Sequence, residues 1–239
     1  IGNHAESDGM TARFPGLGPG WGWDLVSSNA EHAAGQSLNA SQIDRYYWHK
    51  SINLIKSDPV HTMKHTWRKA LLFWNRIEIS NNRDLYYHGR AFPLIGWLMW
   101  IGFPLFLPLS IAAIASGISN NKIQLLTFFI FVQYLTIIPF FVSARFRHPL
   151  TPLLIILAIG GAKALIDIIF KKSDQVKAYA GTIGFVIGIF LLFAADSGID
   201  TNRNDYGLFT DGKLYERLGK IETARDFYHR SLKENTKAS

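Results

Sequence analysis

The chain has 239 residues, of which 48% are hydrophobic and 18% are charged, and its formal net charge is +7. It contains no cysteine, which excludes a disulfide-stapled fold, a cysteine-based zinc site and thiol catalysis. The positive charge does not gather into a basic face, so we expect no nucleic-acid partner. Only nine charged residues lie between Ala91 and Ala195, and this uneven distribution excludes a single soluble globule.

Residues 1–90 are predicted to form an external segment with amphipathic helices. The segment opens at Ile1 with neither an initiator methionine nor an apolar leader, which we interpret as a piece cut from a longer protein. Glycine and proline alternate between Phe14 and Trp23, which predicts an irregular loop. Trp21 and Trp23 of this loop could stack on a sugar in an acceptor groove or only pack on the rest of the protein.

Two helices are predicted after this loop. Ser41 and Asp44 fit a capping box that opens a helix ending near Lys56, before Asp58-Pro59. The second helix, from Val60 to about Ile77, has apolar residues at helical spacing and is predicted to lie in a membrane interface.

Several polar residues of the second helix are candidates for a role. Arg68, Lys69 and Asn75 could contact a lipid substrate or only anchor the helix to headgroups. His61 and His65 are four residues apart, but with no third ligand beside them we expect solvated histidines and no metal site.

Residues 91–195 are predicted to contain four transmembrane helices, because about 20 mostly apolar residues are needed to cross a bilayer. The first of these spans contains Pro104 and Pro108, which predict a kink. The predicted spans are Leu94–Ile118, Ile123–Ser143, Pro149–Phe170 and Ala178–Ala195.

The lysines and arginines of the short loops predict the direction of the spans. Lys122, Lys171, Lys172 and Lys177 lie on one side, against Arg145 and Arg147 on the other. This bias places the lysine loops in the cytoplasm and residues 1–90 and 196–239 outside.

The third predicted span contains a charge pair four residues apart, Lys163 and Asp167. Such a pair is either functional or, because it lies within two turns of the cytoplasmic end, extended toward the lipid headgroups.

Residues 196–239 are predicted to form an external helical hairpin. Small and aromatic residues occur at Gly212, Tyr215, Gly219, Ala224 and Tyr228, a spacing that resembles one tetratricopeptide repeat. The final proline of that repeat is replaced by Thr236. An ordinary amphipathic hairpin is the alternative interpretation.

Several stretches, in their order along the chain, resemble the C-terminal portion of bacterial polytopic glycosyltransferases that use polyprenyl-phosphate sugars. This class, similar to glycosyltransferase family 39, includes protein O-mannosyltransferases and aminoarabinose transferases. The stretches are Ile1–Asn3 with Phe14–Trp21, Ser41–Tyr47, Arg68–Asn75, Ser80–Asn82 and Ala144–Pro149.

The resemblance implies an all-α integral membrane helical bundle in a bacterial inner membrane, with residues 1–90 and 196–239 in the periplasm. It implies transfer of a sugar from a polyprenyl-phosphate donor to a protein or lipid-linked acceptor, with inversion at the sugar. The essential acidic residue of the family lies in a first external loop, and we assign it to no residue here. No cofactor is identified.

Arg145 and Arg147 match the Arg-aromatic-Arg-X-Pro motif of the family, and His148 stands at its variable position. These three residues are candidates for binding the phosphate of the lipid carrier. The same arginines could instead only anchor to headgroups.

Two other classes of protein are considered. A membrane-anchored tetratricopeptide scaffold would bind a protein partner through residues 196–239, but it does not explain the Gly-Pro-Trp loop or the arginine pair. A transporter predicts inverted internal repeats, which the four spans do not show.

Overall fold

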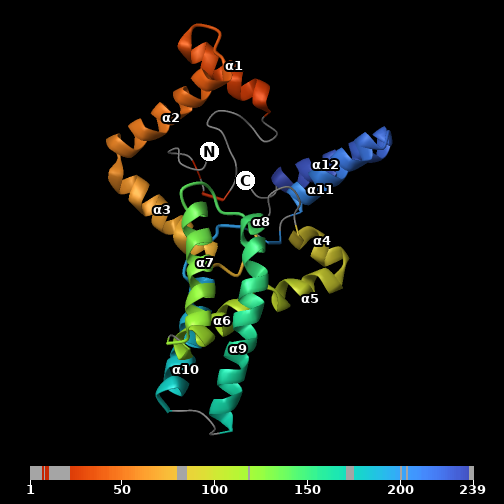
Figure 1. Ribbon diagram of the computed structural model, residues 1–239. Helices are drawn as coiled ribbons and strands as arrows, with labels where there is room; N and C mark the ends of the chain where they lie inside the picture. The colour runs from red at the N-terminus through yellow and green to blue at the C-terminus, as the bar shows by residue number, and fades with distance from the viewer. Residues whose placement is uncertain are drawn as a thin grey trace.

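The computed structural model describes residues 7, 9–10, 22–79, 85–117, 119–170, 175–199, 201–202 and 204–236. Over this part of the chain the protein is built from helices and contains no strand, so the predicted all-α class is confirmed. Figure 1 shows a long helical core whose one end carries the N-terminal helices and the C-terminal hairpin.

The first two helices, α1 (Trp23–Ala34) and α2 (Ala40–Ser57), form a hairpin. The hydroxyl of Tyr47 donates to the Val26 carbonyl at 3.0 Å and joins the two helices. The predicted helix is confirmed, but the capping box is formed by Asn39 and Gln42 and not by Ser41 and Asp44. Asn39 sits one residue before the helix, where its side chain reaches the Gln42 amide at 3.0 Å.

The third helix, α3 (Pro59–Phe73), begins with Asp58 accepting from the His61 amide at 2.9 Å. It ends four residues before the predicted end at Ile77, and residues 74–79 form a non-helical segment. Val60, Met63 and Trp67, which belong to its predicted apolar face, are exposed.

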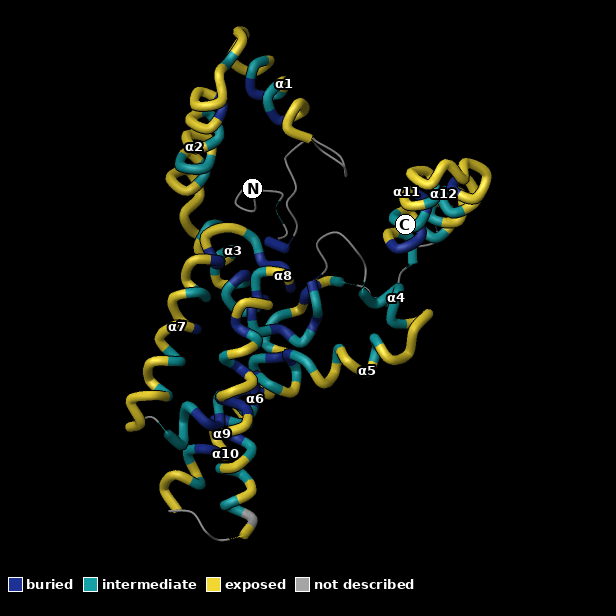
Figure 2. The backbone as a smooth tube through the Cα atoms, turned by 45° about the vertical axis from the view of Figure 1, so that its right-hand side comes forward, coloured by how far each residue is buried: buried dark blue, intermediate teal, exposed yellow. Residues whose placement is uncertain are grey.

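The first predicted span is divided in two, following a short helix α4 (Leu85–Ala91). Helix α5 (Pro93–Ile101) ends at Gly102, where helix α6 (Phe103–Ser116) begins with Pro104 in its first turn. The predicted kink therefore lies at Gly102, just before the first proline, while Pro108 lies inside α6. Figure 2 shows α5 departing from the direction of α6, with most of its surface exposed.

The second predicted span is shorter than expected. Helix α7 (Asn121–Ile137) has 17 residues, about 26 Å of helix against a hydrocarbon core of about 30 Å. It stops at Ile137, two residues before Pro139, which has no backbone N–H to continue the hydrogen bonds of the helix.

The third predicted span begins earlier than expected. Arg145 and Arg147 lie in a one-turn helix α8 (Ala144–Arg147), which continues through a 3-10 turn η1 (His148–Leu150) into α9 (Thr151–Ile169). The expected arginine loop is thus the helical start of the span. The fourth predicted span is α10 (Gln175–Phe193). Ile118, Lys171 and Lys172 lie outside the described residues.

Among the described residues, three helical stretches are long and apolar enough to cross a membrane. They are Pro93–Ser116, Ala144–Ile168 and Gln175–Phe193, whereas Asn121–Ile137 falls short of that length. The structure therefore supports a membrane protein with three candidate spans in place of the four predicted.

Helix α6 packs between α9 and α10, and glycines allow the helices to approach closely. A Cβ at Gly161 of α9 would lie 1.8 Å from the Leu109 carbonyl oxygen of α6. On α10, a Cβ at Gly184 would lie 2.7 Å from the Ile111 carbonyl oxygen and one at Gly188 would lie 2.4 Å from Pro108 Cα. Small residues at such crossings are the usual way in which membrane helices associate.

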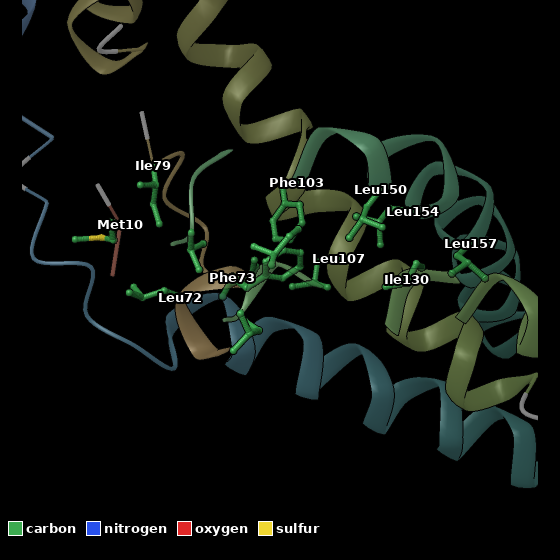
Figure 3. Packing of buried hydrophobic residues seen from close by; sticks show 14 of the residues in the cluster. Met10, Leu72, Phe73, Ile79, Phe103, Leu107, Ile130, Leu150, Leu154 and Leu157 are labelled. Carbon is green, nitrogen blue, oxygen red and sulfur yellow. The ribbon is translucent and has the colours of Figure 1, made fainter. Parts of the chain in front are cut away.

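The hydrophobic core extends from the α6–α9 interface to the end of the bundle that carries α3. Figure 3 shows Leu107, Leu154 and Leu157 along the helices, and Leu72 and Phe73 of α3 closing the core at that end.

The C-terminal hairpin consists of α11 (Asp205–Arg217) and α12 (Ile221–Thr236). Tyr228 of α12 fills the space that a side chain at Gly212 would need, since a Cβ there would lie 2.6 Å from its ring. Ala224 is buried, and the Tyr215 and Phe227 rings stack with centroids 5.2 Å apart. The helical hairpin is confirmed, and its likeness to a tetratricopeptide repeat stays a prediction.

The hairpin also contacts α4. Gly207 lies against the Tyr87 ring, whose hydroxyl donates to Asp211 Oδ2 at 3.0 Å. Arg90 donates to the Thr201 carbonyl and, at 2.5 Å, to Asn204 Oδ1.

Candidate functional site

Most of the residues singled out in the sequence lie at the end of the bundle where α3, α8 and the last turn of α10 meet. We call this group the cationic end and define it as Arg68, Lys69, Arg76, Arg145, Arg147 and His148. The non-helical segment 74–79 passes through it. The amide of Arg76 donates to the Leu192 carbonyl at 3.0 Å, and the amide of Ala144 donates to the Ile79 carbonyl at 2.9 Å, so the segment is bound to both α10 and α8.

Arg147 is buried and holds segment 74–79 in place. Its Nη1 donates to the carbonyls of Phe73, at 3.3 Å, and Asn75, at 2.6 Å. Its Nη2 donates to the Ile77 carbonyl at 2.8 Å and to Glu78 Oε2 at 3.0 Å. The guanidinium also lies 4.4 Å from the centroid of the Phe103 ring.

These contacts use all four Nη hydrogens of Arg147, and the side chain is 3% exposed. The remaining donor, Nε, is buried and has no hydrogen-bond partner among the described residues. The sequence placed Arg147 among the candidates for the lipid phosphate. In the structure it is instead a positioning residue, because the protein already occupies the hydrogens that would face a ligand.

Lys69 is also inside the protein, although it was predicted to contact a lipid. Its side chain is fully buried and Nζ donates to the Phe140 carbonyl at 2.9 Å. Burial lowers the pKa of Lys69 to about 8, because the charged ammonium loses its hydration. Gly9 passes over the lysine stem with φ of 77°, and a Cβ there would lie 2.7 Å from Lys69 Cγ.

Arg68 and Asn75 bind the chain that follows α10. Arg68 Nη2 lies 3.4 Å from the carbonyls of Asp196 and Ser197. Asn75 Nδ2 donates to the Ala195 carbonyl at 2.5 Å, while its Oδ1 accepts from the Ile77 amide at 2.8 Å. Both side chains therefore join segment 74–79 and α3 to residues 195–197.

Arg145 and His148 differ from the other predicted ligands because both are exposed. Arg145 lies over the ring of its neighbour Phe146, with Cζ 5.0 Å from the centroid. Within the described part of the chain, neither residue has a hydrogen-bond or ion-pair partner for its side chain. They are the members of the predicted phosphate motif that can receive an external anion.

Arg76 was not singled out in the sequence. Its guanidinium carbon lies 5.1 Å from the Phe193 ring centroid and 6.0 Å from that of Trp100. It borders a cavity of about 50 Å³ lined by Arg76, Tyr86, Met99, Trp100 and Pro104. The signal available in the sequence was an arginine near the end of the predicted amphipathic helix, followed by tryptophans in the next apolar stretch.

Of the two tryptophans offered as the lining of an acceptor groove, the described one, Trp23, is not brought to this end. Trp21 lies outside the described residues. Trp23 is 60% exposed in the first turn of α1, and Figure 1 shows α1 standing apart from α3 and α8.

No group of three or more potential metal ligands occurs among the residues that the structure describes. His61 and His65 lie side by side with ring centroids 6.1 Å apart. Within α9, no ion pair joins the charged side chains of Lys163 and Asp167.

Comparison of the chain with protein-family models, with curated protein sequences and with solved structures found no match. The described part of the chain defines a helical protein with three candidate membrane spans. One end of it carries the exposed side chains of Arg145 and His148 beside the buried Arg147, which fixes the local backbone.

Proposed function

We propose that this chain is the C-terminal part of a membrane glycosyltransferase that transfers a sugar from a polyprenyl-phosphate donor to a protein or lipid-linked acceptor. The observation that carries the proposal is the pairing of exposed Arg145 and His148 with buried Arg147 in a single turn. An exposed arginine and an exposed histidine stand at the start of an apolar helix, and the buried arginine holds the backbone beneath them.

The exposed pair would bind the donor phosphate. Arginine forms charge-assisted, often bidentate hydrogen bonds with phosphate oxygens, and a histidine can add a donor to the same anion. The exposed apolar residues beside the cationic end, such as Phe140, offer a surface for the prenyl chain.

In the proposed reaction an acceptor hydroxyl attacks the anomeric carbon of the sugar, and the bond from that carbon to the phosphate oxygen breaks. The proton of the hydroxyl goes to a general base, which we assign to no residue of this chain. Polyprenyl phosphate leaves with its additional negative charge, which the guanidinium of Arg145 and an imidazole N–H of His148 stabilise.

The activity test uses the protein in membranes with a labelled polyprenyl-phosphate sugar. Arg145→Ala combined with His148→Ala is expected to reduce donor binding and sugar transfer at least tenfold, because each lost charge-assisted hydrogen bond is worth about 1.5–3 kcal/mol. Lys177→Ala, an exposed cation at the opposite end of α10, is the matched control. Unchanged donor binding in the double variant would remove the assignment.

We further propose that the protein lies in a bacterial inner membrane with residues 1–90 and 196–239 in the periplasm. Support comes from the arrangement of the helices, which places α1–α4 and α11–α12 at the same end, opposite Lys122 and Lys177. The chain contains no cysteine, so a single introduced cysteine is a unique label. A membrane-impermeant thiol reagent should label Lys64→Cys and Lys213→Cys from outside, but not Lys177→Cys. The reverse pattern would refute the orientation.

A second candidate function is a membrane-anchored scaffold. The observation that favours it is the α11–α12 hairpin, which leaves Leu218, Ile221 and Leu232 exposed. Leu218→Asp combined with Leu232→Asp should abolish binding of a protein partner held by this hairpin. The same variant should leave sugar transfer unchanged.

A further inference from the structure

The cavity beside Arg76 has the features of an anion site at a membrane surface. Among the described residues that line it, Arg76 is the one cation, and the others are Tyr86, Met99, Trp100 and Pro104. A single water needs about 10–15 Å³ of such space, so a cavity of about 50 Å³ admits a group the size of a phosphate.

No described residue neutralises the charge of Arg76. Among the described residues its guanidinium has neither a hydrogen-bond acceptor nor a carboxylate partner, and its recorded contacts are with the rings of Trp100 and Phe193. Glu78, two residues further along the chain, is bound at 3.0 Å by Arg147. The cavity therefore combines a positive charge with donors that no oxygen of a described residue accepts.

The surroundings of the cavity are apolar and exposed. Trp97, Trp100, Leu105 and Phe193 are all at least 45% exposed, on α5, α6 and α10. Aromatic side chains of this kind are typical of the depth at which lipid headgroups lie, and the exposed aliphatic and aromatic surface below them suits a hydrocarbon chain.

We propose that Arg76 and this cavity bind the phosphate group of a membrane lipid, with the hydrocarbon chain along the exposed faces of α5 and α10. The site is separate from Arg145 and His148, and the proposal does not rest on sugar transfer. Arginine suits the role because its planar guanidinium can stack against Trp100 and Phe193 while its edge donates to phosphate oxygens. A glycerophospholipid and a polyprenyl phosphate present the same chemistry at this position.

The test measures lipid binding to the full chain in a neutral detergent by native mass spectrometry. The probes are phosphatidylglycerol, a polyprenyl phosphate and the corresponding polyprenol without phosphate. Arg76→Ala should weaken binding of at least one phosphate lipid by about tenfold, and Arg76→Lys should weaken it less, because the lysine keeps the charge but loses the stacked fork. Lys64→Ala, which removes an exposed cation of α3 outside the cavity, should bind like the unmodified chain.

Each outcome bears on the proposal. Arg76-dependent binding of either phosphate lipid supports it, and the tighter of the two identifies the source of the phosphate. Equal binding by Arg76→Ala and the unmodified chain overturns it, as does polyprenol binding as tight as that of polyprenyl phosphate. Displacement by an equal concentration of inorganic phosphate would assign the cavity to free phosphate and overturn the lipid part.

Two further measurements separate this proposal from other effects. Circular dichroism should show the same helix content for Arg76→Ala as for the unmodified chain, because the Arg76 side chain makes no hydrogen bond within the described protein. Arg76-dependent binding of phosphatidylglycerol, with sugar transfer absent, would leave this site standing while the proposed function fails.

Discussion

The guanidinium of Arg147 lies 3.0 Å from the carboxylate of Glu78, a residue 69 positions earlier in the chain. Both side chains are largely buried, at 3% and 15% exposure. Removing one partner of a buried pair leaves an uncompensated charge, which costs about 3–5 kcal/mol. Arg147→Met should therefore lower the free energy of unfolding by about this amount, measured by thermal unfolding in detergent.

The companion variant for this pair is Arg147→Met with Glu78→Gln. It removes the charge left behind and should recover part of the loss. Equal stability of the Arg147→Met variant and the unmodified chain would contradict the role given to Arg147.

Lys69 predicts a pH dependence of stability. Its pKa is about 8 in the folded protein against 10.5 for the ordinary side chain, so between these values the unfolded chain binds more protons than the folded one. Stability from this group therefore rises as the pH rises above about 8. The apparent melting temperature of the unmodified chain should rise from pH 7.5 to 9.5. Lys69→Met, which lacks the titrating group, should not show this rise. Parallel pH profiles for the two proteins would contradict the assignment.

Gly161 and Gly160 are neighbours in α9 with opposite expected responses to alanine. At Gly161 a methyl group would meet the Leu109 carbonyl oxygen at 1.8 Å, whereas at Gly160 the nearest atom is Ala113 Cβ at 3.6 Å. Gly161→Ala should destabilise the protein by about 1–3 kcal/mol or more through overpacking. Gly160→Ala should be neutral or stabilising by up to about 1 kcal/mol, because alanine favours helix. Thermal unfolding of the two variants measures this difference. Equal changes in stability for Gly161→Ala and Gly160→Ala would refute the α6–α9 packing.

Tyr87 predicts how the C-terminal hairpin is held. Hydrogen bonding to Asp211 and burial raise the pKa of Tyr87 to about 12, with burial the larger cause. Tyr87→Ala should release α11 and speed proteolytic cleavage at residues 196–204, and Tyr87→Phe should have a smaller effect because the ring still covers Gly207. Tyr179→Ala, an exposed tyrosine on α10, is the control. Cleavage at the same rate in Tyr87→Ala and the control would contradict the contact.

Much of the helical framework could be predicted because its signals are local. The position of α10 follows from a continuous apolar stretch, and the end of α2 follows from Asp58-Pro59. The hairpin followed from Gly212 and Tyr228, whose complementary sizes require two helices to cross at that point.

The parts that could not be predicted depend on contacts between distant segments. Arg147 was expected at an external surface because a helix-end arginine in sequence looks like any other cation. Its acceptors lie 69 to 74 residues away, and only the fold brings them to it. Arg76 was missed for the same reason, since its cavity is built by α4, α5 and α6 and its ring contacts by α5 and α10.

The break at Gly102 has a consequence for the surrounding lipid. The stretch Pro93–Ser116 reaches the hydrocarbon thickness of about 30 Å only if α5 and α6 are counted together. Because α5 departs from the direction of α6, the part aligned with the bundle is α6, whose 14 residues give about 21 Å of length. A bilayer meeting so short a helix adapts by thinning beside it. Headgroups next to α6 would then sink toward the protein, and the depression would form next to Pro104, where Arg76 borders its cavity. Hydrophobic mismatch would thus deliver phosphate groups to a depth that a flat membrane surface would not reach.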